Sequence, residues 1–476
     1  MIVSRDDGVT GLALIKSLGK FSVASILNFV IGIVAVIILT RYFEPYIYGA
    51  WNVFISAANF LTYFFSFGFN DAFVRFSVER PFANDKRAFI TSCIIKSIQL
   101  SLVFLPLALL FHQDLEIYLF HENNIYMLML LFLYTFALLV VNRYMVNFFR
   151  VFNDVKNYTF LQVGSNAVAK MIVFFTLVSK VDVMGVLFWQ TIGGCAFCFF
   201  VLVIYSKRIF STKYRKVVLD SDVYKFAGIS WFNTILFQMG IFVINVVISS
   251  MLGLSAFGIY ASTNIFSSTI AVLSNAFTAY WSVFMFKYYR DEQKKIMKMH
   301  DYMMLGCITI MQILLMLQSV AYLFLGDDYQ RSREFFSFIV CASLISMLSE
   351  TTQYGILIKK RLYELSWICI TYFTCNIALA IILMNWYGIA GAGMALLMAS
   401  CIRLVLLTWR GQKYYRSIDN LKKSIVGLLL LSFMSIVNYC LFANVMSYVL
   451  QTIAFIIAVI MYRNQINLLY TKIKKG

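Results

Sequence analysis

Stretches of about 20 apolar residues recur along the whole chain, separated by short polar segments. A helix of that length is long enough to cross the hydrocarbon core of a bilayer. The pattern predicts about fourteen spans, at approximately 21–40, 50–69, 89–111, 125–143, 158–178, 184–205, 226–250, 257–285, 302–324, 335–357, 366–384, 388–408, 424–443 and 445–462. Only a short polar break at Asn444 separates the last two. The sequence therefore predicts an all-α polytopic membrane protein.

Composition supports this class of protein. Of the 476 residues, 61% are hydrophobic and only 13% are charged, more apolar surface than a soluble domain of this size could bury. The first apolar stretch has no small-residue cleavage site and continues into "TRYFEPYIYG", so we expect a retained helix rather than a signal peptide. The chain lacks a G-x-x-x-x-G-K-[ST] motif and any metal-like spacing of cysteine or histidine, so we expect no cofactor.

Basic residues indicate the orientation in the membrane. If the N-terminus is inside, most of the 40 Lys and Arg residues fall in cytoplasmic segments, and the external loops hold only Arg41, Lys180, Arg331 and Arg333. This asymmetry is what the positive-inside rule describes, and it predicts that both termini are cytoplasmic. The net charge of +18 is then explained by loops beside anionic lipid headgroups, without a nucleic-acid partner.

Three features of the first half of the chain recur in the second half. "KFSVASILN" (20–28) and "KFAGISWFN" (225–233) share K-F-x-x-x-S-x-x-N, and each opens a long apolar stretch. An aromatic residue and a glycine follow each stretch, at Gly49 and Gly258. Glycine-containing turns then lie at "DVMGV" (182–186) and "WYGIAGAG" (386–393). Matches in the same order at an offset of about 205 indicate a parallel repeat of six spans.

The repeat predicts the domain organisation. We expect an N-terminal six-helix bundle at 1–205, a basic cytoplasmic linker at 206–225, and a second six-helix bundle at 226–409. Residues 410–476 would add two helices and a cytoplasmic tail. The two bundles would surround a central cleft.

Polar residues fall on single faces of several predicted spans. These stripes are Asn52, Ser56, Asn59, Tyr63 and Ser66; Ser92, Lys96 and Gln99; Gln162, Asn166 and Lys170; and Asn264, Ser268, Asn275, Thr278 and Ser282. Hydroxyl and amide groups commonly join helices within membranes, but a lysine there needs water or a partner. Because Glu350 is the only acidic residue within the predicted spans, we expect a hydrated, positively charged cleft.

Individual basic residues differ in how well they fit such a cleft. Lys170 lies about 12 residues into its span, too deep to extend easily to the interface, whereas Lys96 is nearer the cytoplasmic end and can reach it. Arg143 and Arg403, near cytoplasmic span ends, fit boundary anchoring equally well, and Arg41 lies beside Glu44 at an external end. The candidate substrate-binding residues are Lys170, Lys96, Arg143, Arg403, Arg41, Asn28, Asn59 and Asn233.

Four segments resemble polysaccharide flippases of the Wzx type, which belong to the multidrug/oligosaccharidyl-lipid/polysaccharide exporter superfamily. They are "SILNFVIGIVAVIILTRYFEPYIYGAWNVF" (25–54), "FSFGFNDAFVRF" (65–76), "FFRVFNDVKNY" (148–158) and "YGIAGAG" (387–393). The resemblance covers essentially the whole chain. It implies two bundles that form a V around a cleft opening alternately to either side of the bacterial inner membrane.

The same resemblance implies a substrate. Similar flippases carry undecaprenyl-pyrophosphate-linked oligosaccharide, the repeat unit of O-antigen or a related surface polysaccharide. Basic residues of the cleft, here Lys96 and Lys170, would meet the pyrophosphate while the sugars occupy its polar part. The implied partners are this lipid-linked oligosaccharide, membrane lipids and other surface-polysaccharide assembly proteins, and the protein would not be an enzyme.

Two other functions remain open from the residues alone. A multidrug or cation antiporter shares the architecture, but a cation site should contain embedded acids, and the predicted spans offer little besides Glu350. A polysaccharide polymerase or ligase should carry a large external loop, whereas the longest predicted here lies near 112–124. Sugar composition, a coupling ion and the oligomeric state do not follow from the sequence.

Overall fold

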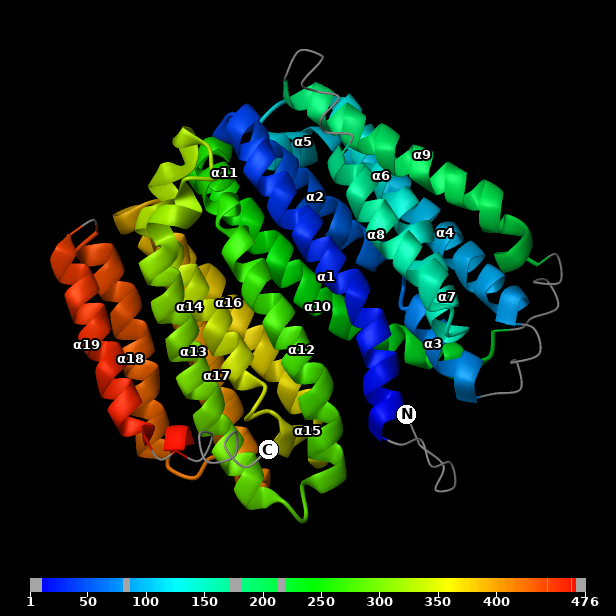
Figure 1. The fold of residues 1–476 in the computed structure, drawn as a ribbon. Coiled ribbons are helices and arrows are strands. Elements are labelled where there is room, and N and C mark those ends of the chain that lie inside the picture. The colour runs from blue at the N-terminus through cyan, green and yellow to red at the C-terminus, as the bar shows by residue number, and fades with distance from the viewer. Residues whose placement is uncertain are drawn as a thin grey trace. The chain divides into compact units, whose positions relative to one another are not determined.

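The computed structural model describes residues 11–79, 86–171, 182–211, 219–442, 444–463 and 465–467. This described part consists of helices joined by short turns and contains no strand (Figure 1). The predicted all-α fold is confirmed.

Most of the helices are suited to a membrane. Within the described residues, nine helices are long and apolar enough to cross a bilayer, or up to 11 if each of two bent helix pairs is one span. Two shorter apolar helices cover Ile26–Tyr42 and Val445–Met461. The chain is therefore a multi-pass membrane protein. The count of about fourteen spans stays a prediction, since residues 172–178 of the predicted span 158–178 lie outside the described part.

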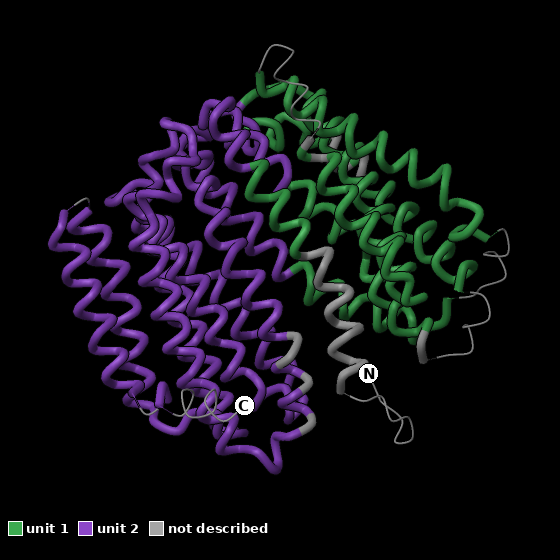
Figure 2. The backbone as a smooth tube through the Cα atoms, viewed as in Figure 1, with its two compact units in different colours: residues 1–35, 57–117, 122–235 green, residues 36–56, 118–121, 236–476 purple. Residues whose placement is uncertain are grey.

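The chain divides into two compact units (Figure 2). Unit 1 comprises residues 1–35, 57–117 and 122–235, and unit 2 comprises residues 36–56, 118–121 and 236–476. Four helices, α1 (Gly11–Tyr42), α2 (Pro45–Phe65), α5 (His112–Phe120) and α10 (Ser221–Leu252), contribute residues to both. The domain boundaries expected from the sequence stay predictions, and parts of the linker (212–218) and of the tail (468–476) lie outside the described residues.

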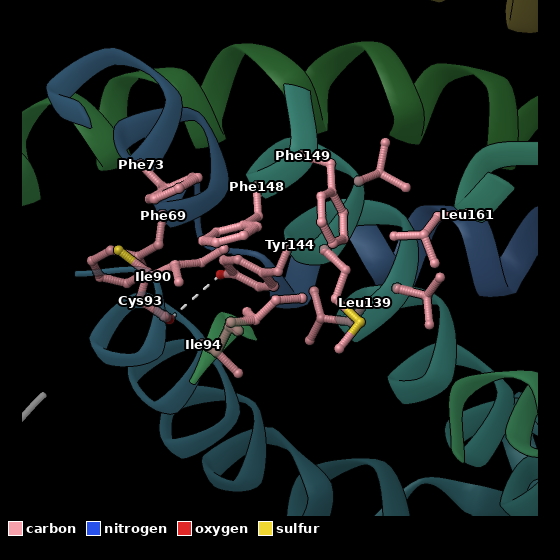
Figure 3. Close-up of a cluster of buried hydrophobic side chains, with 14 of the residues drawn as sticks. Phe69, Phe73, Ile90, Cys93, Ile94, Leu139, Tyr144, Phe148, Phe149 and Leu161 are labelled. Carbon is pink, nitrogen blue, oxygen red and sulfur yellow. Dashed lines mark hydrogen bonds between the residues drawn. The ribbon is translucent and has the colours of Figure 1, made fainter. Parts of the chain in front are cut away.

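Unit 1 is built around an aromatic core. Its other helices are α3 (Phe69–Glu79), α4 (Lys86–Leu110), α6 (Ile125–Leu138), the π-helix η2 (Leu139–Met145), α7 (Val146–Val151), α8 (Val155–Met171) and α9 (Val183–Ile209), and α5 (His112–Phe120) lies partly in each unit. Phe69, Phe73, Phe148 and Phe149 are almost fully buried and lie in one cluster with Tyr144 (Figure 3). The Tyr144 hydroxyl is not left unpaired, because it is hydrogen-bonded to Ser97 and lies 3.5 Å from the carbonyl oxygen of Cys93.

The second predicted span is broken in unit 1. Helices α2 and α3 meet at 55°, where Phe67 and Gly68 adopt positive φ angles of 44° and 71°. The indole Nε1 of Trp231, on α10, donates a 2.8 Å hydrogen bond to the carbonyl oxygen of Phe64, which also accepts a 3.3 Å hydrogen bond from the backbone nitrogen of Phe67 at the break. Gly68 also approaches α10 closely, since a Cβ at this position would collide with the carbonyl of Ala227. Packing against α10 therefore stabilises the break.

Unit 2 contains the remaining helices. These are α11 (Leu254–Ser262), α12 (Asn264–Tyr288), α13 (Gln293–Tyr322), the 3-10 helix η5 (Asp327–Glu334), α14 (Phe336–Ser349), α15 (Tyr354–Ile358), α16 (Leu362–Tyr387), α17 (Ile389–Tyr414), α18 (Leu421–Cys440) and α19 (Val445–Met461). Helices α16 and α17 form a hairpin about Gly388, whose φ of 56° favours glycine. Helix α17 also packs along α14.

The predicted repeat is visible in local geometry. Asn153, between α7 and α8, and Lys360, between α15 and α16, have φ angles of 55° and 57°. Shortly after each turn, a side chain accepts a hydrogen bond from a tyrosine hydroxyl of the following long helix. Tyr205 donates to Asn157 Oδ1 at 2.6 Å, and Tyr414 donates to Glu364 Oε1 at 2.6 Å. The number of residues from Asn153 to Lys360 equals the number from Asn157 to Glu364. The equal spacing indicates that these residues occupy equivalent positions in two repeats.

Candidate functional site: the polar face of unit 1

Two residues proposed separately from the sequence lie on one helix pair. Asn28, on α1, accepts a 3.0 Å hydrogen bond from the side chain of Asn166, on α8. Its own amide donates to the carbonyl oxygen of Gln162 at 3.5 Å. One turn further along α1, a Cβ on Gly32 would lie 3.3 Å from Lys170 Nζ. The absence of a side chain at Gly32 thus gives the lysine room beside Asn28 and Asn166.

The π-helix η2 extends this polar contact. Ser165, adjacent to Asn166 on α8, donates a 2.8 Å hydrogen bond to Asn142 Oδ1. Asn142 and Arg143 are both in η2, within the single span Ile125–Val151. Short π-helical segments widen a helix locally and are frequent at functional sites. Here η2 places Asn142 against α8 and the next residue, Arg143, against α3.

Arg143 lies beside an embedded carboxylate. Its guanidinium carbon is 4.1 Å from the centre of the Tyr63 ring, and Nη2 is 3.8 Å from Asp71 Oδ1. Asp71 Oδ2 accepts a 2.7 Å hydrogen bond from Ser230 on α10. The Arg143 Nε atom is buried and has no hydrogen-bond partner among the described residues. The ion pair is loose, so the guanidinium retains capacity for a further acceptor.

We call the set Asn28, Asn142, Arg143, Gln162, Ser165, Asn166, Lys170 and Asp71 the polar face of unit 1. All of these residues are partly exposed. Lys170 is not hydrogen-bonded or ion-paired to any other described residue, whereas Arg143 shares its charge with Asp71. Because an unpaired charge is costly within a membrane, Lys170 needs water or an anion. The arrangement can therefore bind a negatively charged group through Lys170 and hydroxyl groups through the neighbouring amides.

Asp71 is a second acidic residue to consider beside Glu350, the one acidic residue within the spans predicted from the sequence. The second predicted span ends near 69, and the structure adds α3 after a bend at Gly68. If α2 and α3 form one bent span, it continues through Ser77 and includes Asp71. A hydropathy pattern contains no direct signal for the bend, although the "FGF" before Asn70 supplies the glycine that it needs.

Three candidate residues lie elsewhere on unit 1. Lys96 on α4, Asn59 on α2 and Asn233 on α10 are all exposed. The structure shows no hydrogen bond or ion pair from Lys96 to another described residue. Lys96 and Asn59 are not hydrogen-bonded to Lys170 or Asn28 in this part of the chain.

The candidate Arg403 belongs to a charge-balanced group in unit 2. Its guanidinium carbon lies 5.7 Å from the centre of the Tyr372 ring, and it interacts electrostatically with Glu350. Glu350 also accepts hydrogen bonds from Gln353, at 2.7 Å, and from Thr278. Glu350 follows Arg143 in the chain by the same number of residues as Thr278 follows Asp71. Glu350 is therefore equivalent to Arg143, and the second repeat has an acidic residue where the first has a basic one.

Arg41 contacts the end of a helix in unit 2. Its Nε and Nη2 atoms donate 3.3 Å hydrogen bonds to the carbonyl oxygens of Phe324 and Leu323, respectively. These carbonyls follow α13, where a helix leaves its last acceptors unpaired. The Arg41 side chain is exposed and thus caps α13 in this structure.

A helical multi-pass protein with a broken span and a polar, basic face has the features of a membrane transporter. Residues 14–280 match the family described as "Polysaccharide biosynthesis protein", and the chain belongs to this family. No curated protein matches the chain. No group of His, Cys, Asp and Glu able to hold a metal ion occurs within the described residues.

Several solved structures have a fold similar to that of this chain. The chain is similar to the lipid II flippase MurJ in its inward closed conformation, with a TM-score of 0.67 and 16% identity over 94% of this chain and 99% of that one. It is also similar to an outward-facing multidrug resistance MATE family transporter of the MOP superfamily, with a TM-score of 0.53 and 14% identity over 84% of this chain and 95% of the other. At these identities the similarity concerns the fold.

Proposed function

We propose that this protein is a flippase that moves undecaprenyl-pyrophosphate-linked oligosaccharide, a repeat unit of O-antigen or a related surface polysaccharide, across the bacterial inner membrane by alternating access. The observation that carries the proposal is the position of Lys170, which is partly buried beside Asn28 and Asn166 without an acidic partner among the described residues. Membership of the polysaccharide biosynthesis family and the fold shared with a lipid II flippase support it.

The chemistry of the polar face fits such a headgroup. A diphosphate needs positive charge at membrane depth, where attraction between opposite charges is stronger than in bulk water. Lys170 supplies one positive charge, and Arg143 supplies a second that the 3.8 Å contact with Asp71 satisfies only in part. Sugar hydroxyls donate and accept hydrogen bonds, as do the side-chain amides of Asn28, Asn166 and Gln162.

The other candidates would act at later or earlier stages of transport. Lys96, Asn59 and Asn233 are exposed on unit 1, and Arg403 and Arg41 belong to unit 2. In the proposed orientation both termini are cytoplasmic, no cofactor is needed and the protein is not an enzyme. Membrane lipids and other surface-polysaccharide assembly proteins are the proposed partners.

A cation or drug antiporter is the alternative, because it shares the fold and because Asp71 adds an embedded acid. However, Asp71 lies beside Arg143, and Glu350 interacts with Arg403. A carboxylate already close to an arginine is a poor site for a second cation. The charge arrangement therefore favours an anionic substrate.

Deletion of the gene tests the function. We expect loss of surface glycan together with accumulation of lipid-linked repeat units on the cytoplasmic face, and restoration of both by the wild-type chain. Appearance of unpolymerised units on the periplasmic face would instead indicate a polymerase or ligase. Normal surface glycan with increased drug sensitivity would support the antiporter and reject the proposal.

A further inference from the structure

Unit 2 contains a charged cavity at one end of the α16–α17 hairpin. It has a volume of about 460 Å³ and is lined by residues from the start of α16 and the end of α17. Three basic side chains, Arg361, Arg410 and Lys413, and one acidic side chain, Glu364, line it together with Tyr363, Trp367, Ile368 and Tyr414. Because two membrane spans end here, the cavity lies at the depth where lipid headgroups begin.

The single carboxylate does not balance the basic residues. Glu364 Oε1 accepts hydrogen bonds from Tyr414 at 2.6 Å, Tyr363 at 3.3 Å and Arg361 at 3.4 Å. Arg410 lies over the Trp409 ring at 4.3 Å, and exposed Lys413 forms no ion pair with a described residue. The cavity thus keeps an excess of positive charge.

The same carboxylate leaves one acceptor unused. Glu364 is 7% exposed, and its Oε2 atom is buried without a hydrogen-bond partner among the described residues. A buried carboxylate oxygen without a donor is unfavourable. The cavity therefore offers cations for an anion and, beside them, an acceptor for a hydroxyl or ammonium group.

The first repeat shows that the excess charge is not a consequence of the fold. At the equivalent turn, Asp154 stands where the second repeat has Arg361, and it forms a 2.8 Å ion pair with Arg208. Tyr205 and Tyr414 are equivalent tyrosines of the two repeats. Arg410 precedes Tyr414 by as many residues as Val201 precedes Tyr205, and Lys413 corresponds in the same way to Ile204. Arg361, Arg410 and Lys413 thus have no basic residue at the equivalent positions of the first repeat.

We propose that this cavity binds the phosphate headgroup of an anionic phospholipid of the phosphatidylglycerol type. Arg410 and Lys413 would bind the phosphate, and a glycerol hydroxyl would donate to Glu364 Oε2. The exposed aromatic residues Tyr363 and Trp367, 66% and 54% exposed, are of the kind found at headgroup level. Basic pockets between helix ends are known recognition sites for anionic lipids. The proposal requires only that the chain spans a membrane and is independent of the transported substrate.

Native mass spectrometry of the purified full-length protein tests it. The protein is taken from nanodiscs of phosphatidylglycerol or phosphatidylcholine, and retained lipid is counted for the wild type, for Arg410→Gln/Lys413→Gln and for Lys359→Gln/Lys422→Gln. The last variant removes two exposed charges, one just before α16 and one at the start of α18. We expect retention of phosphatidylglycerol to fall about fivefold or more per removed cavity charge and to be unchanged in the control.

Further lipids distinguish the contribution of the phosphate charge from that of the glycerol hydroxyl. Phosphatidylmethanol has the same charge but no hydroxyl, so we expect it to be retained less well, and equal retention would reject the role of Glu364. Free glycerol 3-phosphate should not displace the lipid at comparable concentration; if it does, the site recognises a soluble phosphate. Equal retention of phosphatidylglycerol and phosphatidylcholine, or equal loss in both double variants, would overturn the proposal. If the cavity double variant does not fold, Lys413→Gln alone, at an exposed position, is compared with Lys422→Gln.

Discussion

Gly49 and Gly258 meet across a symmetric contact between α2 and α11. A Cβ on Gly49 would lie 3.0 Å from the backbone nitrogen of Gly258, and a Cβ on Gly258 would lie 3.0 Å from that of Gly49. Each would also collide with a carbonyl oxygen of the other helix, at Leu254 and Pro45 respectively. Small residues allow such close approach of helices in membranes. Gly49 and Gly258 each follow an aromatic residue, so one sequence signature supplies both sides of the contact.

This contact predicts the effect of adding one methyl group. Gly49→Ala and Gly258→Ala should each lower the free energy of unfolding by about 1–3 kcal/mol, because neither backbone can move aside as a flexible side chain would. Gly306→Ala, on α13, is the matched control, since nothing lies within 4 Å of its added Cβ, and it should be neutral or slightly stabilising. Thermal unfolding of the three variants in detergent provides the comparison. A Gly306→Ala variant as unstable as the other two would show that the effect is not due to this contact.

Hydropathy alone accounts for the helical class and for the positions of most spans. The apolar runs are as long as a bilayer is thick, and backbone groups in lipid must be satisfied within the helix, so a run of this kind has few alternatives. Polarity also identified Asn28 and Lys170 as unusual residues within apolar stretches. Which residues they contact depends on how α1 and α8 pack, and a single sequence does not contain that information.

The bend between α2 and α3 shows what the sequence pattern could not provide. It is stabilised by Trp231 and Ala227, which lie far away in the chain. The π-helix that positions Arg143 is equally invisible to hydropathy, because a hydropathy pattern does not distinguish a π-helical turn from an α-helical one. Tertiary contacts, not local preferences, decide both features.

Variants of the Asp71–Arg143 ion pair distinguish its contribution to protein stability from its contribution to transport. Asp71→Asn leaves the Arg143 charge unpaired within the membrane and should destabilise the protein, whereas Asp71→Asn with Arg143→Gln removes both charges and should recover much of the lost stability. If Arg143 also contacts the substrate, the double variant should remain defective in glycan export. Unfolding temperature and surface glycan are measured on the wild type, Asp71→Asn, Arg143→Gln and the double variant. Full export by a stable double variant would assign Arg143 a structural role only.

Asp154 predicts a pH dependence outside the membrane spans. Burial alone would raise the pKa of its carboxyl, but hydrogen bonds from Asn157 and Arg208 outweigh this effect and hold the pKa below its usual value of 3.8. A carboxyl with a lowered folded-state pKa stabilises the fold above the unfolded-state value and loses this contribution as the pH falls further. Because the Arg208 side chain is half exposed, the contribution should be under about 1 kcal/mol.

The measurement compares unfolding temperatures of the wild type and Asp154→Asn between pH 6 and about pH 3. The wild type should be more stable at pH 6, and the difference should narrow as the pH falls. Asp291→Asn, which alters an exposed carboxylate without an ion pair among the described residues, should show no such trend. A difference that stays constant with pH would mean that the Asp154 charge does not stabilise the turn.

Substitutions of Lys170 test the proposed function directly. If its charge meets a diphosphate, Lys170→Arg should retain glycan export, Lys170→Gln should lose much of it, and Lys170→Glu should lose nearly all. The reason is that one charge in a partly dehydrated site contributes several kcal/mol to binding an anion, far more than at a water-exposed surface. Lys156→Gln, at an exposed position near the start of the same helix, removes an equal charge and should leave export unchanged. Lys96 variants should follow the same order as Lys170 variants, with smaller effects.

Surface glycan is measured at matched membrane levels of each variant, so that differences in expression do not enter the comparison. If Lys170 acted only as a hydrogen-bond donor, Gln could replace it, because a side-chain amide can donate as well as an ammonium group can. Charge alone distinguishes Arg from Gln at this position. Equal export by the Arg and Gln variants would therefore reject a diphosphate contact at Lys170 and leave this residue a role in packing α8 against α1.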